Sequence, residues 1–148
     1  MKLSQTAAYA FHAALRLAGN PKASFIPCNK LAELGKMPER FLLQILRDLA
    51  KKGILESTRG GKGGFMLARR PDEISVLEVI EAVDGPIVAT LPLKSGLPGP
   101  TGERLHDVLR KVAEDVRREL QAVTLSDLLE GHDASKPAPK SGKRAKGR

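Results

Sequence analysis

Apolar residues recur at helical spacing through the first fifty residues and predict three consecutive helices. Ser4 is a candidate N-cap for the first, which stops at Gly19-Asn20-Pro21. A short second helix covers 28–35 and ends at Gly35, and a third begins near Pro38 and ends at Gly53. The third has an apolar stripe made of Phe41, Leu42, Ile45, Leu46 and Leu49.

Two short β-compatible runs follow the third helix and predict a hairpin. Ile54-Leu55 and Phe65-Met66-Leu67 flank a basic, glycine-rich tip at 59–64. Glycines allow the backbone to approach a ligand closely, and the basic side chains suit a minor groove or its phosphates. A nucleotide-binding loop is the alternative, but the segment lacks the Walker spacing and does not open a helix.

The rest of the chain alternates helical signals with a breaker-rich segment. Ser75 and Glu78 form a capping box for a short helix with one apolar face, and Thr124 with Asp127 predicts a final short helix ending near Glu130. Between them lie a Pro/Gly-rich loop and a long helix from about Thr101 to Val123. The tail has no apolar period, so we expect it to be disordered.

A short helix, a turn, a longer helix and a basic hairpin predict a mainly α fold. We expect a winged helix-turn-helix with a two-stranded β wing and a long C-terminal dimerisation helix. The division is a DNA-binding domain at 1–84, a loop at 85–100, the dimerisation and final helices at 101–130 and a basic tail at 131–148. Helical hairpins that never touch DNA remain an alternative.

Charge is segregated along the chain, whose formal net charge is +8. Residues 1–70 hold 13 Lys or Arg against 4 Asp or Glu, 71–130 hold 6 against 12, and 131–148 hold 6 against 1. A basic first half is typical of phosphate contact, although surface solvation also explains it. The tail adds nonspecific DNA affinity or is only solvated.

The long predicted helix carries an apolar stripe that needs a partner surface. We expect a homodimer, with packing inside one chain as the alternative. The candidate interface residues are Leu105, Val108, Leu109, Val112, Val116 and Leu120.

Other function classes are poorly supported by the sequence. No apolar run is long enough to cross a membrane, and we expect a cytoplasmic protein. Three scattered histidines and one cysteine offer no catalytic or metal-binding pattern, so we expect neither an enzyme nor a metal site. The cysteine, Cys28, begins the second helix, where a thiol pKa can fall; it is a candidate redox switch or a small buried residue.

Two segments in particular resemble the Rrf2 family of bacterial transcription regulators. The first runs from Gly53-Ile-Leu-Glu-Ser-Thr-Arg-Gly-Gly-Lys-Gly-Gly to Phe-Met-Leu, and the second is Pro71-Asp-Glu-Ile-Ser-Val-Leu-Glu-Val-Ile-Glu-Ala-Val-Asp-Gly. The resemblance extends from Met1 to about Glu130 and implies a homodimer on a pseudopalindromic operator. It implies that the start of the third helix enters the major groove, that Arg59 enters the minor groove, and that Lys2 and Tyr9 hold the DNA backbone.

Many members of that family hold an iron–sulfur cluster with three cysteines in the loop before the long helix. Here that loop contains none. The resemblance also places His12 and His106 where some members have a histidine ligand, but without thiolates they are expected to be relics. We therefore expect no cluster and no other cofactor.

Together these features predict a sequence-specific DNA-binding repressor, free of a cluster and with double-stranded DNA as its partner. A small-molecule effector near the loop is a further candidate partner, and the sequence does not identify it. A nonspecific nucleic-acid-binding or protein-interaction module is the alternative. The candidate DNA contacts are Lys2, Tyr9, Lys36, Pro38, Glu39, Arg40, Gln44, Arg59, Gly60, Lys62, Gly63 and Gly64.

Overall fold

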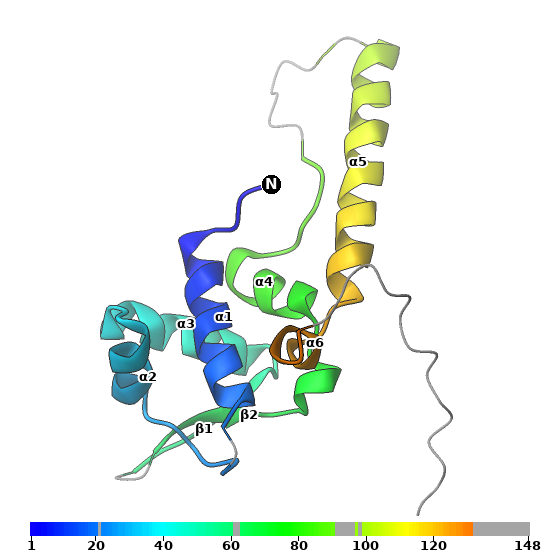
Figure 1. The fold of residues 1–148 in the computed structure, drawn as a ribbon. Helices are drawn as coiled ribbons and strands as arrows, with labels where there is room; N and C mark the ends of the chain where they lie inside the picture. Colours follow the sequence, from blue (N-terminus) through cyan, green and yellow to red (C-terminus); the bar gives the residue numbers. More distant parts are fainter. Residues whose placement is uncertain (21, 61–62, 91–96, 98, 132–148) are drawn as a thin grey trace, which may run out of the picture.

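The computed structural model describes residues 1–20, 22–60, 63–90, 97 and 99–131. It contains the predicted helices and hairpin, together with one 3-10 turn, η1, that the apolar pattern did not predict (Figure 1). In chain order the elements are α1 (Gln5–Ala18), α2 (Cys28–Gly35), α3 (Glu39–Lys51), β1 (Leu55–Thr58), β2 (Gly64–Leu67), η1 (Pro71–Glu73), α4 (Val76–Asp84), α5 (Gly99–Gln121) and α6 (Leu125–Leu129).

Helix α1 forms the centre of the folded head, by which we mean the part from α1 to α4 (Figure 1). Its N-cap is Ser4, whose Oγ accepts a hydrogen bond of 2.9 Å from the backbone N–H of Ala7. Ala10, Ala13 and Ala14 are completely buried. Small side chains on that face allow the neighbouring helices to approach α1 closely.

The core is built around α3 and closed by residues from the later elements. Leu42, Leu46 and Leu49 have no exposed surface, and Ile45 is nearly as buried. Phe41 does not belong to this buried stripe, since 42% of it is exposed. That part of the prediction was wrong because Phe41 lies on the flank of α3, against α1 instead of inside the core.

In the turn between α2 and α3, the left-handed residue that ends the helix is Lys36 and not Gly35. Gly35 is the last helical residue, and Lys36 adopts the left-handed conformation, with φ 52° and ψ 44°. A Cβ at Gly35 would lie 2.4 Å from Cε of Met37 and 3.0 Å from the ring of His12. Gly35 therefore leaves room for the side chains of Met37 and His12, and its own φ is not positive.

The wing is an antiparallel hairpin with a third attachment. Leu55 pairs with Leu67 at its base and Thr58 with Gly64 near its tip. Phe65 also exchanges two backbone hydrogen bonds of 2.9 Å with Ile26, in the segment before α2. The wing is thus fixed to the helix-turn-helix and not only to its own partner strand.

Helix α5 stands apart from the head over much of its length (Figure 1). It begins at Gly99 and ends at Gln121, two residues earlier at each end than predicted, and none of its 23 residues is buried. Near its C-terminal end, Arg117 forms an ion pair with Glu81 of α4. No helix in the described part of the chain combines the length and apolar character needed to span a bilayer.

Candidate nucleic-acid interface

Helix α3 presents two opposite faces, one buried and one polar. The exposed face carries Glu39, Arg40, Gln44 and Arg47, while the opposite face forms the core. The side-chain N–H of Gln44 donates to Oδ1 of Asp48 at 3.1 Å, which leaves its carbonyl oxygen and second N–H for other partners. This helix therefore has the surface that a recognition helix needs.

The start of α3 is also accessible. Pro38 is its N-cap, and it offers no side-chain acceptor for the amides of the first turn. Both Pro38 and the preceding Lys36 are exposed. The backbone N–H groups of the first turn of α3 and the side chain of Lys36 are thus available at the N-terminus of α3, where the resemblance places DNA.

The wing tip is shaped by glycines. Gly60 has φ +107°, and the N–H of Gly63 donates to its carbonyl at 2.8 Å. A Cβ at Gly63 would lie 2.8 Å from the carbonyl oxygens of both Gly60 and Thr58. Arg59 is exposed at this turn, whereas the predicted contact Lys62 lies outside the described residues.

Gly64 occupies a different environment from the one expected of a DNA contact. It is buried, and a Cβ there would lie 2.4 Å from the carbonyl oxygen of Ile26. The structure therefore does not support a direct contact by Gly64. Its lack of a side chain allows β2 to approach the segment before α2.

The two predicted contacts near the N-terminus lie in different places. Tyr9 packs against Phe41 of α3 and is thus next to the recognition helix. Lys2 is exposed, but its segment lines a cavity with Asp84, Pro86 and Leu120, at the end of α1 away from the wing (Figure 1). The structure does not bring Lys2 together with the other predicted contacts.

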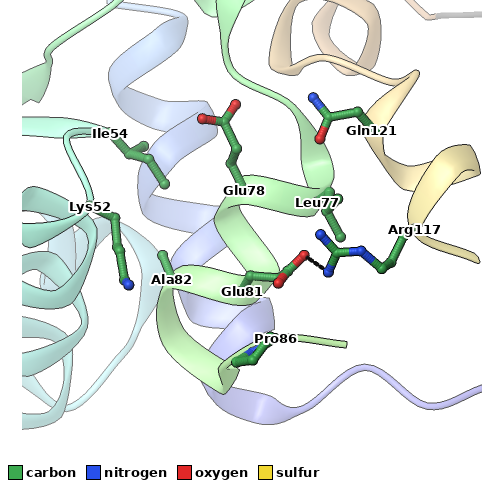
Figure 2. A pocket seen from close by; sticks show the side chains of 9 residues that line it. All are labelled: Lys52, Ile54, Leu77, Glu78, Glu81, Ala82, Pro86, Arg117 and Gln121. Atoms are coloured by element: carbon green, nitrogen blue, oxygen red, sulfur yellow. Dashed lines mark hydrogen bonds and ion pairs between the residues drawn. The ribbon is translucent and has the colours of Figure 1, made fainter. Parts of the chain in front are cut away.

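A cavity of about 410 Å³ separates the head from the C-terminal part of α5 (Figure 2). Its walls combine apolar side chains with charges of both signs, including Lys52 after α3, Glu81 of α4 and Arg117 of α5. The loop that follows α4 contributes Pro86. It is one of several cavities in the described part of the chain, and it lies beside the start of the loop that follows α4.

Cys28 does not have the activated thiol that its position suggested. Burial raises its pKa, the carboxylate of Glu39 raises it further, and Arg47 only partly opposes them. Its Sγ lies 3.7 Å from the carbonyl oxygen of Glu39, to which the thiol can donate. Of the two alternatives left open for Cys28, these surroundings favour the small packed residue over the redox switch, because the neighbouring groups disfavour the thiolate.

The donor groups of this chain do not fit an iron–sulfur cluster. Its single thiol lies in α2 and not in the loop before α5, and His106 is exposed on α5. His12 lies on α1 beside Gly35, and its Nδ1 is buried without a hydrogen-bond partner among the described residues. No group of three His, Cys, Asp or Glu side chains in that part of the chain could hold a metal ion.

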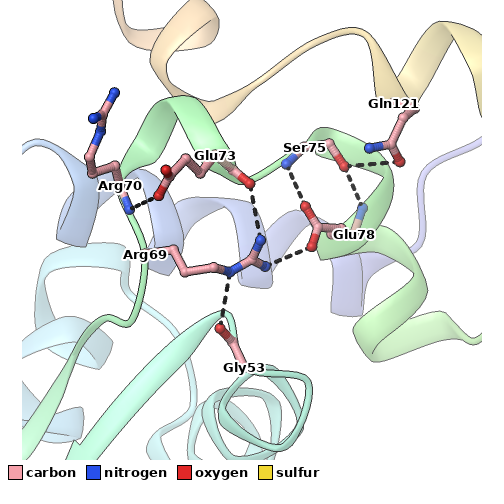
Figure 3. A network of polar contacts seen from close by, with 7 residues as sticks. All are labelled: Gly53, Arg69, Arg70, Glu73, Ser75, Glu78 and Gln121. Atoms are coloured by element: carbon pink, nitrogen blue, oxygen red, sulfur yellow. Dashed lines mark hydrogen bonds and ion pairs between the residues drawn. The ribbon is translucent and has the colours of Figure 1, made fainter. Parts of the chain in front are cut away.

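The sequence patterns did not single out Arg69, which follows the wing. Its guanidinium donates to Gly53 in the turn after α3, to Glu73 of η1 and to Glu78 of α4 (Figure 3). A lone arginine in a basic segment gives no signal for such a role. Only the folded arrangement brings its partners together.

The comparisons with known proteins agree with this architecture. The family model for Rrf2, described as an iron-dependent transcriptional regulator, matches residues 3–131. The HTH-type regulator Rv1287 of Mycobacterium tuberculosis is 35% identical over 134 residues, covering 88% of this chain and 83% of the relative. IscR of Escherichia coli is 31% identical over 134 residues, covering 90% and 83%.

Solved structures give the same result. CymR, the global cysteine regulator of Bacillus subtilis, superposes with a TM-score of 0.72 at 25% identity, covering 90% of this chain and 99% of CymR. IscR of T. potens gives a TM-score of 0.68 at 26% identity, covering 95% and 94%. These proteins are transcriptional regulators and not enzymes. With its winged helix-turn-helix head and its long C-terminal helix, the chain belongs to the Rrf2 family of DNA-binding transcriptional regulators.

Proposed function

We propose that this protein is a homodimeric repressor that binds a pseudopalindromic operator without an iron–sulfur cluster. The observation that carries the proposal is the apolar stripe of α5. Leu105, Val108, Leu109 and Val112 are between 37% and 60% exposed, on a helix that extends away from its own head. A second copy of the same helix would cover them, and a twofold dimer matches a twofold DNA site.

We assign base contacts to the exposed face of α3 and to the wing. Arg40 and Gln44 carry the side chains that bond to guanine and adenine edges in the major groove. Arg59, at the glycine turn of the wing, is suited to a narrow minor groove. Lys36, Pro38, Glu39 and the glycines at 60 and 63 complete the proposed surface.

Repression is the simplest output of such a dimer. A protein bound over a promoter excludes RNA polymerase by occupying the same DNA, and this requires no surface other than the DNA interface. The relatives support the regulatory class, since CymR is described as a global cysteine regulator. A reporter gene with the operator across its promoter tests the direction: repression predicts higher expression when the regulator is deleted.

The direct test is selection of DNA from a random duplex library by the purified protein. The proposal predicts a palindromic motif, binding by a dimer and a protein without visible absorbance. Tight but sequence-independent, salt-sensitive binding would instead indicate a nonspecific nucleic-acid-binding module. A brown protein would contradict the assignment as cluster-free.

A further inference from the structure

The structure assigns to Arg69 the role of a positioning residue: it fixes the recognition helix relative to α5 and thereby sets the spacing of operator half-sites that the dimer accepts. The inference rests on the proposed dimer. Arg69 itself would not touch DNA. It would act through the end of α3 and the start of α4.

Each of the three guanidinium nitrogens of Arg69 donates a hydrogen bond within the protein (Figure 3). Nε donates to the carbonyl of Gly53 at 3.4 Å, Nη1 to the carbonyl of Glu73 at 3.0 Å, and Nη2 to Oε1 of Glu78 at 2.6 Å. Every nitrogen of the planar fork has a partner, and the side chain is only 36% exposed. Although it belongs to the basic half of the chain, Arg69 is used internally.

The first of these bonds reaches the end of the recognition helix. Gly53 directly follows the C-cap of α3 and has φ +73°, which favours glycine. The next residue, Ile54, is buried and donates its N–H to the carbonyl of Leu49 at 3.0 Å. Holding the Gly53 carbonyl therefore fixes the turn where α3 passes into the wing.

The bond to Glu78 leads toward α5. Oε2 of Glu78 accepts from the backbone N–H of Ser75 at 3.0 Å, and Oγ of Ser75 accepts from the N–H of Glu78 at 3.1 Å. Ser75 Oγ also lies 3.5 Å from Oε1 of Gln121, the last residue of α5. The capping box of α4 is thus in contact with both Arg69 and α5.

Backbone bonds complete the connection at the same place. The N–H of Val76 donates to the carbonyl of Val123 at 2.8 Å, and the N–H of Leu125 donates to the carbonyl of Ile74 at 3.0 Å. These bonds attach the chain that follows α5 to the start of α4. A continuous set of hydrogen bonds therefore joins the end of α3, through Arg69, to the end of α5.

Operator spacing is sensitive to this arrangement. One base pair moves a half-site by about 3.4 Å along the DNA and rotates it by about 34° around the axis. If α5 holds the two copies together, the attachment of each head to α5 determines which spacing both recognition helices can reach. Without the fork of Arg69, the heads should accept spacings that the native dimer rejects.

The test compares Arg69→Met with Arg70→Met on the full chain. Arg70 is the matched control, because its guanidinium pairs with Asp72 only two residues away. The probes are duplexes that carry the motif selected by the native protein, with the half-site spacing changed by minus one, zero or plus one base pair. Affinity is measured for each duplex at several salt concentrations, and dimerisation by sedimentation.

We expect the native protein and Arg70→Met to lose about tenfold or more in affinity when the spacing changes by one base pair, a penalty on the scale of a mismatched base. For Arg69→Met the three spacings should differ by less than about threefold, with an unchanged salt slope and an intact dimer. Retention of the native preference would overturn the inference. A salt slope reduced by about one would also overturn it, because Arg69 would then be a phosphate contact.

Glu78→Gln provides a second variant should Arg69→Met fail to fold. The Gln carbonyl can still accept from the Ser75 N–H, while the charge that pairs with Arg69 is removed. The spacing preference should weaken in the same direction, and an unchanged preference would count against the role of Arg69. Failure of the native protein to select any palindrome would instead refute the proposed function, before the variants are compared.

Discussion

The ring of Tyr9 in α1 meets the ring of Phe41 in α3 edge to face, with centroids 5.7 Å apart and planes at 76°. The hydroxyl of Tyr9 accepts a hydrogen bond of 3.0 Å from Nε2 of Gln5, so its own O–H can still donate. Tyr9 therefore serves two purposes at the proposed interface: its ring holds α1 against the recognition helix, and its hydroxyl is available to a DNA phosphate.

Tyr9→Phe should separate these purposes. The ring contact is kept, so the free energy of unfolding should change by less than about 0.5 kcal/mol. Loss of one hydrogen bond to DNA should weaken operator binding by about 3- to 10-fold. Phe41→Leu removes the ring contact instead. It should lower the free energy of unfolding by about 1 kcal/mol, as measured by urea unfolding. Unchanged affinity in Tyr9→Phe would exclude a phosphate contact by the hydroxyl.

Arg59→Ala should weaken operator binding about 10-fold or more and reduce the salt slope by about one. Arg59 is exposed at the wing tip, so the fold should tolerate its loss. Lys143→Ala removes a charge of the same sign from the tail and should have little effect. Binding titrations at four salt concentrations measure both quantities. Equal losses for the two variants would argue against a specific wing contact.

Val112→Asp should dissociate the proposed dimer. Val112 is 53% exposed in the single chain, and an uncompensated carboxylate in the covered interface would cost several kcal/mol. Lys111→Asp places the same carboxylate at an exposed neighbouring position outside the apolar stripe, with a net charge change that is one unit larger, so it is a stringent control. Analytical ultracentrifugation distinguishes the two. A dimeric Val112→Asp protein would contradict the assignment of α5 as the interface.

Cys28 should react slowly with iodoacetamide at neutral pH. Its raised pKa keeps the thiol protonated, and the alkylation rate should rise only above the pH at which a free cysteine ionises. The same shift should stabilise the fold below the pKa of the unfolded thiol, a contribution lost as the pH rises through the raised value. Unfolded protein in urea gives the reference rate. Faster alkylation of the folded chain would restore Cys28 as a reactive thiol.

Glu78 should make folding sensitive to acid. Its burial raises the pKa, but hydrogen bonds from Ser75 and the charge and hydrogen bond of Arg69 bring the net pKa below the ordinary value for glutamate. The resulting stabilisation is present above the ordinary pKa and is lost as the pH falls through the lowered one. Between neutral pH and pH 3, the free energy of unfolding should therefore fall less steeply for Glu78→Gln than for the native chain. Glu103→Gln, at an exposed position on α5, is the control.

Local sequence signals predicted the elements well where the deciding contacts are short-range. The Ser75 and Thr124 capping boxes both form, because each bond spans only three residues. The winged helix-turn-helix class is confirmed for the same reason, since its helices and hairpin follow apolar spacing and glycines.

Contacts between distant segments were beyond these signals. The apolar period placed Phe41 in the core, but the position of α1 puts it at the surface beside Tyr9. The glycine-rich pattern placed Gly64 in a DNA-binding tip, but the segment before α2 packs directly against it. Arg69 gave no signal at all, because its partners come from the end of α3, η1 and α4.

The distribution of charge within the head has a kinetic consequence. Residues 1–70 hold 13 Lys or Arg against 4 Asp or Glu, whereas η1 and α4, the latter in contact with α5, carry five carboxylates and no Lys or Arg. The head is therefore an electric dipole, and the field of DNA should turn it during diffusion so that its basic side arrives first. Salt that screens this field should slow the encounter with DNA, even where the final contacts between protein and bases remain the same.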